Sequence, residues 1–324
     1  IVATSGDTGA AAISAIKNRK NINIFVLHPN KKISEIQRKF MTTVNSKNVF
    51  NIAVDGNFDD CQSIVKSMFL DNKFRKLTNL SGVNSINWAR IIFQIVYYFF
   101  SYFQVASEKE KINFSVPTGN FGDIYAGYFA KKMGLPINKL IAATNENDIL
   151  KRVINTGYYK PKKVQETISP SMDIQVASNF ERLLFDVYLG DTKKIVNTMR
   201  KLKEEGEFKI EKEELNRINK DFASETLSDQ ETIKIIKEMY KNFNILVDPH
   251  TAVGIGALKK SNLKGKNIVL STAHPFKFSQ VVFESAKKEP SIPESLENSI
   301  NVKEKYDTIS CDLEKIKKYV LERL

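Results

Sequence analysis

The sequence predicts an α/β fold with a largely parallel sheet covered by helices. Short apolar runs alternate with segments of helical spacing from the first residues onward, and polar, glycine-rich turns follow several of these runs. The hydrophobic content of 42% and charged content of 27% are ordinary for a globular protein. The chain has 324 residues, more than one hydrophobic core usually spans, so two domains are expected.

The first part of the chain alternates between strand and helix. Residues 25–27 form a short apolar strand, residues 34–43 have helical spacing, and residues 49–54 form a second strand. Asp59 and Asp60 open a helix that continues to Phe69, because acidic side chains in a first turn favour the positive end of the helix dipole.

The later part of the chain repeats this alternation. Residues 111–116 and 140–144 are predicted strands with a helix over 123–133 between them, and residues 268–271 form another strand. The charged segment 204–221 is predicted to be an exposed helical insertion. Residues 285–301 contain two prolines and are predicted to form a surface loop before a final charged helix.

The segment 88–106 is almost entirely apolar and approaches the length of a membrane-spanning helix. Arg90, Gln94, Ser101 and Gln104 interrupt the apolar run, and several of its aromatic residues are tyrosines. We therefore interpret it as a buried helix at the centre of the larger domain.

The charge balance is basic, with a formal net charge of +12. Lysines are interleaved with acidic residues along the chain, which indicates solvated surfaces rather than a nucleic-acid site. Cys61 and Cys311 have no metal-binding spacing and are interpreted as free thiols of a reducing cytosol. The first residues resemble no signal peptide, so a cytoplasmic location without a membrane partner is expected.

The most informative turn is SVPTGNFGD, residues 115–123, which follows a predicted strand and precedes a predicted helix. Two glycines let several backbone N–H groups face one concavity, and the helix N-terminus adds positive potential, a combination that suits a phosphate monoester. A plain strand-to-helix connection is the alternative. The Lys-Ser/Thr pair of a nucleotide-binding P-loop is missing from this turn.

Three further stretches carry polar groups. ATSGDTG, residues 3–9, is a second turn of this kind and could hold a carboxylate-sized anion; the alternative is a helix cap made by Ser5 or Asp7. Arg90 stands near the start of an apolar helix and needs an anion or an ion pair there. Residues 271–278 follow a strand and contain His274, which alone is more typical of a structural role.

Seven stretches in this order resemble the threonine synthase family, in its bacterial and fungal branch. They cover nearly the whole chain, so the ordered set is far more specific than any one stretch. The stretches are ATSGDTGAA, NSINWAR, SVPTGNFGDIYAGYFAKKMGLP, AATNENDIL, SPSMDI, DPHTAVGIGAL and STAHPFKF. The resemblance implies a pyridoxal-phosphate (PLP) enzyme of fold type II with two open, mostly parallel sheets, which lacks the N-terminal part of the family fold.

The resemblance also implies the reaction and the site residues. The family converts O-phospho-L-homoserine and water to L-threonine and phosphate, with PLP as the electron sink. The cofactor phosphate would bind Gly119, Asn120, Phe121, Gly122 and Asp123, with Thr272 at the pyridine nitrogen and Asp7 at the 3′-oxygen. The substrate carboxylate would bind Thr4, Ser5 and Thr8, and the leaving phosphate would bind Ser85, Arg90 and Lys277.

The family's Schiff-base lysine lies in a segment upstream of the SGDTG turn, so it is expected upstream of Ile1 and no catalytic residue is assigned within the chain. The 324 residues alone are therefore expected to be inactive. Two alternatives stay open: a related phospholyase that releases a 2-oxo acid, and a non-catalytic fragment that binds PLP or phosphate.

The expected domain boundaries are 1–88 for a smaller α/β domain with the substrate-binding turn, and 89–324 for a larger one with the PLP-phosphate loop and the charged insertion. The expected partner is the small substrate, without nucleic acid or a metal, in a monomer or a homodimer.

Overall fold

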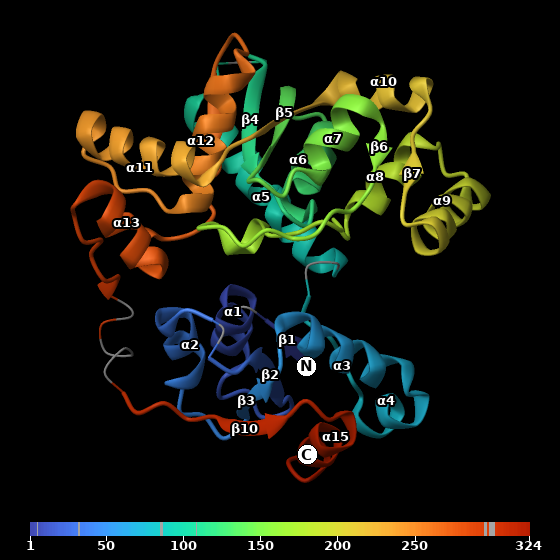
Figure 1. The fold of residues 1–324 in the computed structure, drawn as a ribbon, viewed down its shortest axis with the longest axis vertical. Helices are drawn as coiled ribbons and strands as arrows, with labels where there is room; N and C mark the ends of the chain where they lie inside the picture. The colour runs from blue at the N-terminus through green and yellow to red at the C-terminus, as the bar shows by residue number, and fades with distance from the viewer. Residues whose placement is uncertain (5, 32, 85–86, 108, 295–296, 298–301) are drawn as a thin grey trace. The chain divides into compact units, whose positions relative to one another are not determined.

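The computed structural model describes all residues except 5, 32, 85–86, 108, 295–296 and 298–301 (Figure 1). The chain divides into two compact units. The first consists of Ile1–Asn84 and Ser291–Leu324, and the second of Ser85–Pro290. Among the helices that the structure describes, none is both long and apolar enough to cross a membrane.

The first unit is built on a parallel sheet of order β1-β2-β3-β10. Its strands are β1 (Val2–Ala3), β2 (Ile24–Pro29), β3 (Val49–Asp55) and β10 (Asp307–Ser310). Its helices are α1 (Asp7–Ile16), α2 (Glu35–Thr42), α3 (Phe58–Leu70), α4 (Asn72–Thr78) and α15 (Leu313–Leu321). The elements predicted over 25–27, 34–43, 49–54 and 59–69 are thereby confirmed.

Helices cover both faces of this sheet, which explains why all six residues of β2 are buried. Successive side chains of a strand point to opposite faces. Phe25 and Leu27 therefore pack in one hydrophobic cluster with α3 and α15, whereas Ile24 and Val26 pack in another with α1 and α2.

The C-terminal residues belong to the first unit, which differs from the boundaries predicted from the sequence. β10 pairs with β3 in parallel, from Asp307 opposite Ile52 to Ser310 opposite Asp55. Tyr319 and Val320 of α15 then join the hydrophobic cluster around β2 and β3. Pairing across 250 residues leaves no local signal in the sequence, so a domain running over 89–324 is a prediction that the structure corrects.

The second unit contains a parallel sheet of order β8-β5-β4-β9. Its strands are β4 (Ile112–Pro117), β5 (Ile137–Thr144), β8 (Phe222–Thr226) and β9 (Asn267–Val269). One face is covered by α5 (Trp88–Val105), α6 (Gly122–Lys132) and α7 (Ile149–Thr156). The other is covered by α11 (Asp229–Phe243) and α12 (Pro249–Ser261), followed in the chain by η2 (Pro275–Phe278) and α13 (Ser279–Ala286) (Figure 1).

The predicted helical insertion over 204–221 is wrong in detail. α9 (Thr192–Glu205) is capped at its C-terminus by Gly206, which has a φ of 77°. The strand β7 (Phe208–Lys209) follows and precedes α10 (Lys212–Asp221). β7 pairs antiparallel with β6 (Tyr158–Tyr159). The Phe208 ring stacks on Tyr159 at 4.7 Å, and α8 (Phe180–Val187) packs in the same core. A buried aromatic residue inside a charged segment therefore interrupts the helix.

The helix predicted over 88–106 forms as α5, but only one side of it is buried. Ile91, Ile95, Tyr98 and Tyr102 face the core, and several aromatic residues on the opposite side remain exposed. A loop was predicted over residues 285–301. α13 extends to Ala286, so the first two of these residues are helical, and residues 295–296 and 298–301 lie outside the described part of the chain. The final charged helix is confirmed as α15.

Candidate functional site

The turn between β4 and α6 carries a set of free hydrogen-bond donors. The backbone N–H groups of residues 119–123 donate to no acceptor among the residues that the structure describes. Just before the turn, Thr118 N donates to Ala143 O at 2.8 Å, and just after it Tyr125 N donates to Phe121 O at 3.1 Å. Consecutive unpaired N–H groups at a helix N-terminus form a site for an anion of phosphate size.

Two features hold this turn in shape. Phe121 is in the left-handed conformation with a φ of 65°, and its ring is buried against Phe180 and Phe222 at 5.3 and 5.5 Å. Asn179 donates from its backbone N and its side-chain Nδ2 to the carbonyl oxygen of Asn120, at 3.0 and 3.2 Å. The packing of Phe121 outweighs the cost of its backbone conformation, so the N–H groups stay oriented without a ligand.

Gly119 lies against the segment that contains η1 (Pro170–Met172). A Cβ atom at Gly119 would approach Ser171 O and Ile174 Cδ1 to 2.9 Å and Met172 Cα to 3.2 Å. Only glycine therefore allows the turn to approach this segment so closely.

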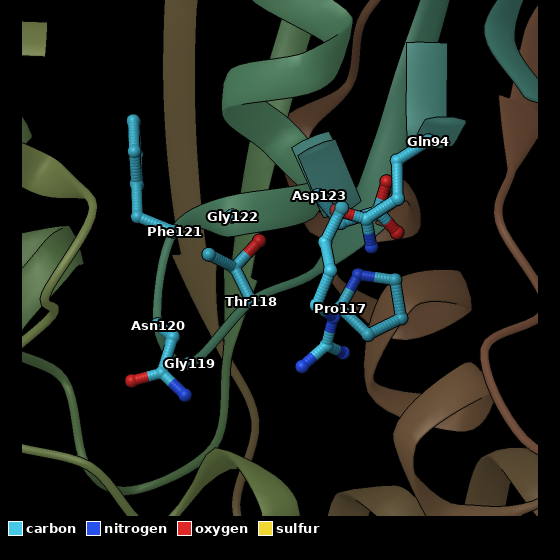
Figure 2. A pocket seen from close by; sticks show the side chains of 9 residues that line it. Gln94, Pro117, Thr118, Gly119, Asn120, Phe121, Gly122 and Asp123 are labelled. Atoms are coloured by element: carbon cyan, nitrogen blue, oxygen red, sulfur yellow. The ribbon is translucent and has the colours of Figure 1, made fainter. Parts of the chain in front are cut away.

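A pocket of about 150 Å³ opens at the turn. Its lining combines residues 117–123 with Arg90 and Gln94, which lie one turn apart on α5 (Figure 2). Figure 2 shows the Phe121 side chain directed away from the pocket, so this residue lines it through its backbone. Burial lowers the pKa of the Arg90 guanidinium. In the sequence Gln94 is only an interruption of an apolar run, and the structure places it in the pocket.

Asp123 brings a carboxyl group to the same turn. The Tyr98 hydroxyl donates to the Asp123 carbonyl oxygen at 2.8 Å and to Oδ1 at 3.2 Å. Burial raises the pKa of Asp123 to about 6, and the hydrogen bond from Tyr98 opposes this shift. Near neutral pH the carboxylate is therefore ionised beside the free N–H groups, where it would repel a bound anion.

We expect Asp123→Asn to bind inorganic phosphate about tenfold more tightly than the wild type at pH 8, a factor in keeping with the loss of one nearby like charge. Below a pH of about 6 the wild-type carboxyl becomes neutral, so the two affinities should converge. Calorimetry gives the dissociation constants of the wild type and of Asp123→Asn at each pH. Because both proteins bind the same phosphate, the ratio of the two constants removes the effect of the titration of phosphate itself. A ratio that does not change between pH 5 and pH 8 would contradict this assignment.

The stability of the two proteins should follow the same titration. The pKa of Asp123 is raised from 3.8 to about 6 in the folded state, so the folded state loses stability as the pH rises from 3.8 to about 6, and the loss is complete above that pH. Asp123→Asn should therefore raise the melting temperature more at pH 8 than at pH 5.

Thr272 follows β9 at the same edge of the sheet as the turn. β9 pairs with β4 in parallel, with Val269 opposite Ser115, and Leu270 N continues the ladder by donating to Ser115 O at 3.0 Å. The ladder ends at Leu270, two residues before Thr272. Thr272, which is exposed, thus follows the carboxyl end of β9, and the 118–123 turn follows the carboxyl end of β4 beside it.

The residues after Thr272 form η2. His274 Nδ1 accepts a hydrogen bond from Phe276 N at 3.2 Å and so caps this short helix, in agreement with a structural role. Lys277 is half-buried within η2. Ser85, the other predicted phosphate-binding residue near Arg90, lies outside the described residues.

The turn at the start of the chain belongs to the first unit. Thr4 is buried, and its Oγ1 accepts hydrogen bonds from Gly6 N at 2.9 Å and Gly9 N at 3.1 Å. Gly6 has a φ of 143°, and a Cβ there would overlap the Gln37 side chain at 2.7 Å. Among the described residues, the side chain that accepts hydrogen bonds from the N–H groups at the start of α1 is Thr4, whereas the sequence suggested Ser5 or Asp7; Ser5 lies outside the described residues.

Asp7 and Thr8 occupy the first turn of α1 and are half-buried. Gln37 Nε2 donates to Asp7 Oδ1 at 3.5 Å. The Thr4 hydroxyl uses its oxygen as an acceptor and keeps its proton for donation.

A buried histidine behind the phosphate turn was not selected from the sequence. Asp248 Oδ1 accepts from His250 Nδ1 at 2.8 Å, and His250 Nε2 accepts from Ser171 N at 3.2 Å. This geometry requires the neutral imidazole with its proton on Nδ1. Because the segment at Ser171 packs against Gly119, the pair supports the turn from behind. The only signal in the sequence is the stretch DPHTAVGIGAL, in which no residue points to that contact.

Two family models match the chain. The one described as "Pyridoxal-phosphate dependent enzyme" matches residues 1–211, and the one described as "Threonine synthase, C-terminal" matches residues 251–320. The chain is 44% identical to threonine synthase of Pseudomonas aeruginosa, over 98% of the chain and 68% of that protein. It is 45% identical to threonine synthase of Saccharomyces cerevisiae, over 99% of the chain and 68% of that protein.

Among solved structures, the chain superimposes on PLP-bound threonine synthase from Brucella melitensis with a TM-score of 0.95 and 44% identity. The match covers 99% of the chain and 70% of that chain. The predicted α/β fold with two open, parallel sheets is thereby confirmed. The 324 residues span about two thirds of the length of these relatives.

Proposed function

The chain belongs to the threonine synthase family, and on that premise we propose that its residues convert O-phospho-L-homoserine and water to L-threonine and phosphate with pyridoxal phosphate. The observation that supports this most directly is the turn of free N–H groups at the N-terminus of α6. A phosphate monoester is common to the cofactor and the substrate, and this turn is built for one.

The residues present fit the cofactor. The N–H groups of residues 119–123 would hold its phosphate, and the close packing of Gly119 leaves the concavity clear of side chains. The Thr272 hydroxyl, just after β9, would donate a hydrogen bond to the unprotonated pyridine nitrogen, and Asp7 would face the 3′-oxygen. When bound, PLP withdraws electrons from the substrate carbon atoms that lose protons.

We propose two further groups of binding residues. Thr4, Ser5 and Thr8 would hold the substrate carboxylate, with the Thr4 proton available because its oxygen already accepts two backbone hydrogen bonds. Ser85, Arg90 and Lys277 would hold the leaving phosphate. A guanidinium can bind two phosphate oxygens at once. Two such contacts would fix the orientation of the phosphate while the bond between its oxygen and the substrate carbon breaks.

The Arg90 assignment predicts a kinetic result. In a preparation that turns over O-phospho-L-homoserine, Arg90→Ala should lower kcat/KM about tenfold to a hundredfold, because one charge-assisted hydrogen bond contributes roughly 1.5–3 kcal/mol. PLP affinity should change much less. Arg90→Lys should recover part of the loss, since it restores the charge but not the fork. Unchanged kinetics with a lower melting temperature would instead identify a structural ion pair.

The product separates the main proposal from the phospholyase alternative. Amino-acid analysis of the reaction should give one threonine for each phosphate released. A 2-oxo acid with ammonia in place of threonine would show that the family scaffold carries out elimination without the addition of water.

Three finer points belong to the same proposal. The partner is the small-molecule substrate rather than a nucleic acid or a membrane, because lysines and acidic residues alternate along the surface segments. The protein acts in the cytoplasm. It acts as a monomer or a homodimer, which light scattering of the purified protein would decide.

A further inference from the structure

A polar network lies at the carboxyl end of β5, and we name it the Asp173 network. Two of its members, Asn145 and Asn147, come just after β5, and the other three, Thr167, Ser169 and Asp173, belong to the segment between β6 and α8. Asn145, Asn147 and Ser169 are at most 2% exposed. The described residues that line the pocket at the phosphate turn include no member of this network, so its members are separate from the ligand site.

The Asp173 carboxylate is the central acceptor of the network. Its Oδ1 accepts from Asn145 Nδ2 at 2.7 Å, from Asn147 Nδ2 at 3.1 Å and from Thr167 Oγ1 at 2.7 Å. Its Oδ2 accepts from Thr167 N at 3.0 Å. Four donors match the acceptor capacity of an ionised carboxylate. A neutral amide has a single acceptor oxygen and would turn its own NH₂ group toward one of these donors.

The Asp173 backbone belongs to the segment that contacts the phosphate turn. Asp173 N donates to Pro170 O at 3.2 Å and so closes η1. Its two neighbours, Met172 and Ile174, both lie against Gly119, where a Cβ atom would approach Met172 Cα to 3.2 Å and Ile174 Cδ1 to 2.9 Å. The carboxylate is therefore held at the end of β5, while the residues on either side of it meet the turn.

The turn is thus fixed to β5 in two ways. Directly, Thr118 N donates to Ala143 O at 2.8 Å. Indirectly, the Asp173 network holds the segment that packs on Gly119. We propose that Asp173 is a positioning residue of the phosphate turn, which keeps the N–H groups of residues 119–123 directed toward a bound phosphate without touching it. The inference rests on the proposed function, because it requires the turn to bind a phosphate.

The test is the affinity of Asp173→Asn for inorganic phosphate and for pyridoxal phosphate, measured by isothermal titration. We expect both ligands to bind at least about tenfold more weakly than to the wild type, which equals the loss of one charge-assisted hydrogen bond to the anion. Thr167→Val is a milder variant of similar shape that removes one donor of the carboxylate. It should weaken both ligands about threefold, as expected for one neutral hydrogen bond.

Asn113→Ala is the matched control for stability. Asn113 is 1% exposed and lies at the amino end of β4, the end opposite the turn. Its side chain donates to Lys264 O and Asn267 Oδ1 at 3.0 and 2.9 Å and accepts from Asn138 Nδ2 at 2.8 Å. Because buried hydrogen bonds are lost in each case, Asn113→Ala and Asp173→Asn should lower the melting temperature similarly. The affinity of Asn113→Ala for phosphate should not change.

A double-mutant cycle separates positioning from a purely structural role. Gly119→Ala places a Cβ atom against Ser171 O and should weaken phosphate binding in the wild-type background. In the Asp173→Asn background the segment is no longer held in place, so the same substitution should cost less affinity. Residues that act through one contact are expected to show such non-additive effects.

Three outcomes would overturn the inference. Wild-type affinity in folded Asp173→Asn or in Thr167→Val would show that the network does not position the turn. Equal losses of affinity in Asp173→Asn and Asn113→Ala would show that affinity only follows stability. A wild-type protein that binds neither inorganic phosphate nor pyridoxal phosphate would contradict the proposed function itself, and the inference with it.

Discussion

Gly119→Val is expected to weaken the binding of pyridoxal phosphate at least a hundredfold. The first atom of the new side chain would lie 2.9 Å from Ser171 O and 3.2 Å from Met172 Cα, and backbone atoms cannot rotate away. The turn must shift, which moves its N–H groups off the phosphate. Loss of two charge-assisted hydrogen bonds, at roughly 1.5–3 kcal/mol each, corresponds to a factor of at least about a hundred.

Isothermal titration with the cofactor measures this effect. Gly56→Val serves as the control, because the three atoms nearest to a Cβ at Gly56 all belong to the side chain of Asp60, which can rotate away. It should bind the cofactor as the wild type does. If Gly119→Val keeps wild-type affinity while its structure is intact, the phosphate is not held by this turn.

Asp248→Ala should reduce the free energy of unfolding of the second unit by roughly 2–4 kcal/mol, because it removes a helix cap and leaves a buried donor without its acceptor. Asp248 is completely buried and accepts from His250 N, His250 Nδ1 and Thr251 N at 2.9, 2.8 and 3.3 Å, and also from Thr251 Oγ1. The substitution removes the cap of α12 and leaves the His250 ring without its acceptor.

Urea denaturation followed by circular dichroism gives the loss. Asp191→Ala is the matched comparison, because Asp191 is also an N-cap aspartate but is exposed, and Lys194 N is its one side-chain hydrogen-bond donor among the residues described. It should lose about 1 kcal/mol, the usual contribution of a cap. Equal losses in the two variants would mean that the buried contacts of Asp248 add nothing beyond capping.

Local patterns were sufficient to predict most elements and the phosphate turn. The strand before the turn, its two glycines and the helix after it are adjacent in the sequence, so their geometry follows from neighbouring residues. The same is true of α3, whose capping box joins Asn57 and Asp60. The fold class needed only the alternation of these local patterns.

Features that depend on distant partners were not predictable. β10 returns to β3, and His250 reaches Ser171 through a fold that no local pattern encodes. α5 was predicted to be buried because its sequence is almost entirely apolar, and nothing in that sequence distinguishes the side packed in the core from the side whose aromatic residues stay exposed. Gly206 is a typical signal for the end of a helix. The high charge of the surrounding segment nevertheless favoured the prediction of one exposed helical segment over 204–221.

The aromatic contacts at the start of α5 have a spectroscopic consequence. The chain contains a single tryptophan, Trp88, which lies two residues before Arg90. Its ring meets Phe129 edge-on at 5.3 Å, and the Arg182 guanidinium lies over it at 5.4 Å. All indole emission of the 324 residues therefore comes from one side chain near the pocket. The wavelengths of this emission overlap those at which a pyridoxal group absorbs. The native protein carries its own energy-transfer donor, so occupancy of the phosphate turn can be followed by intrinsic fluorescence without a label.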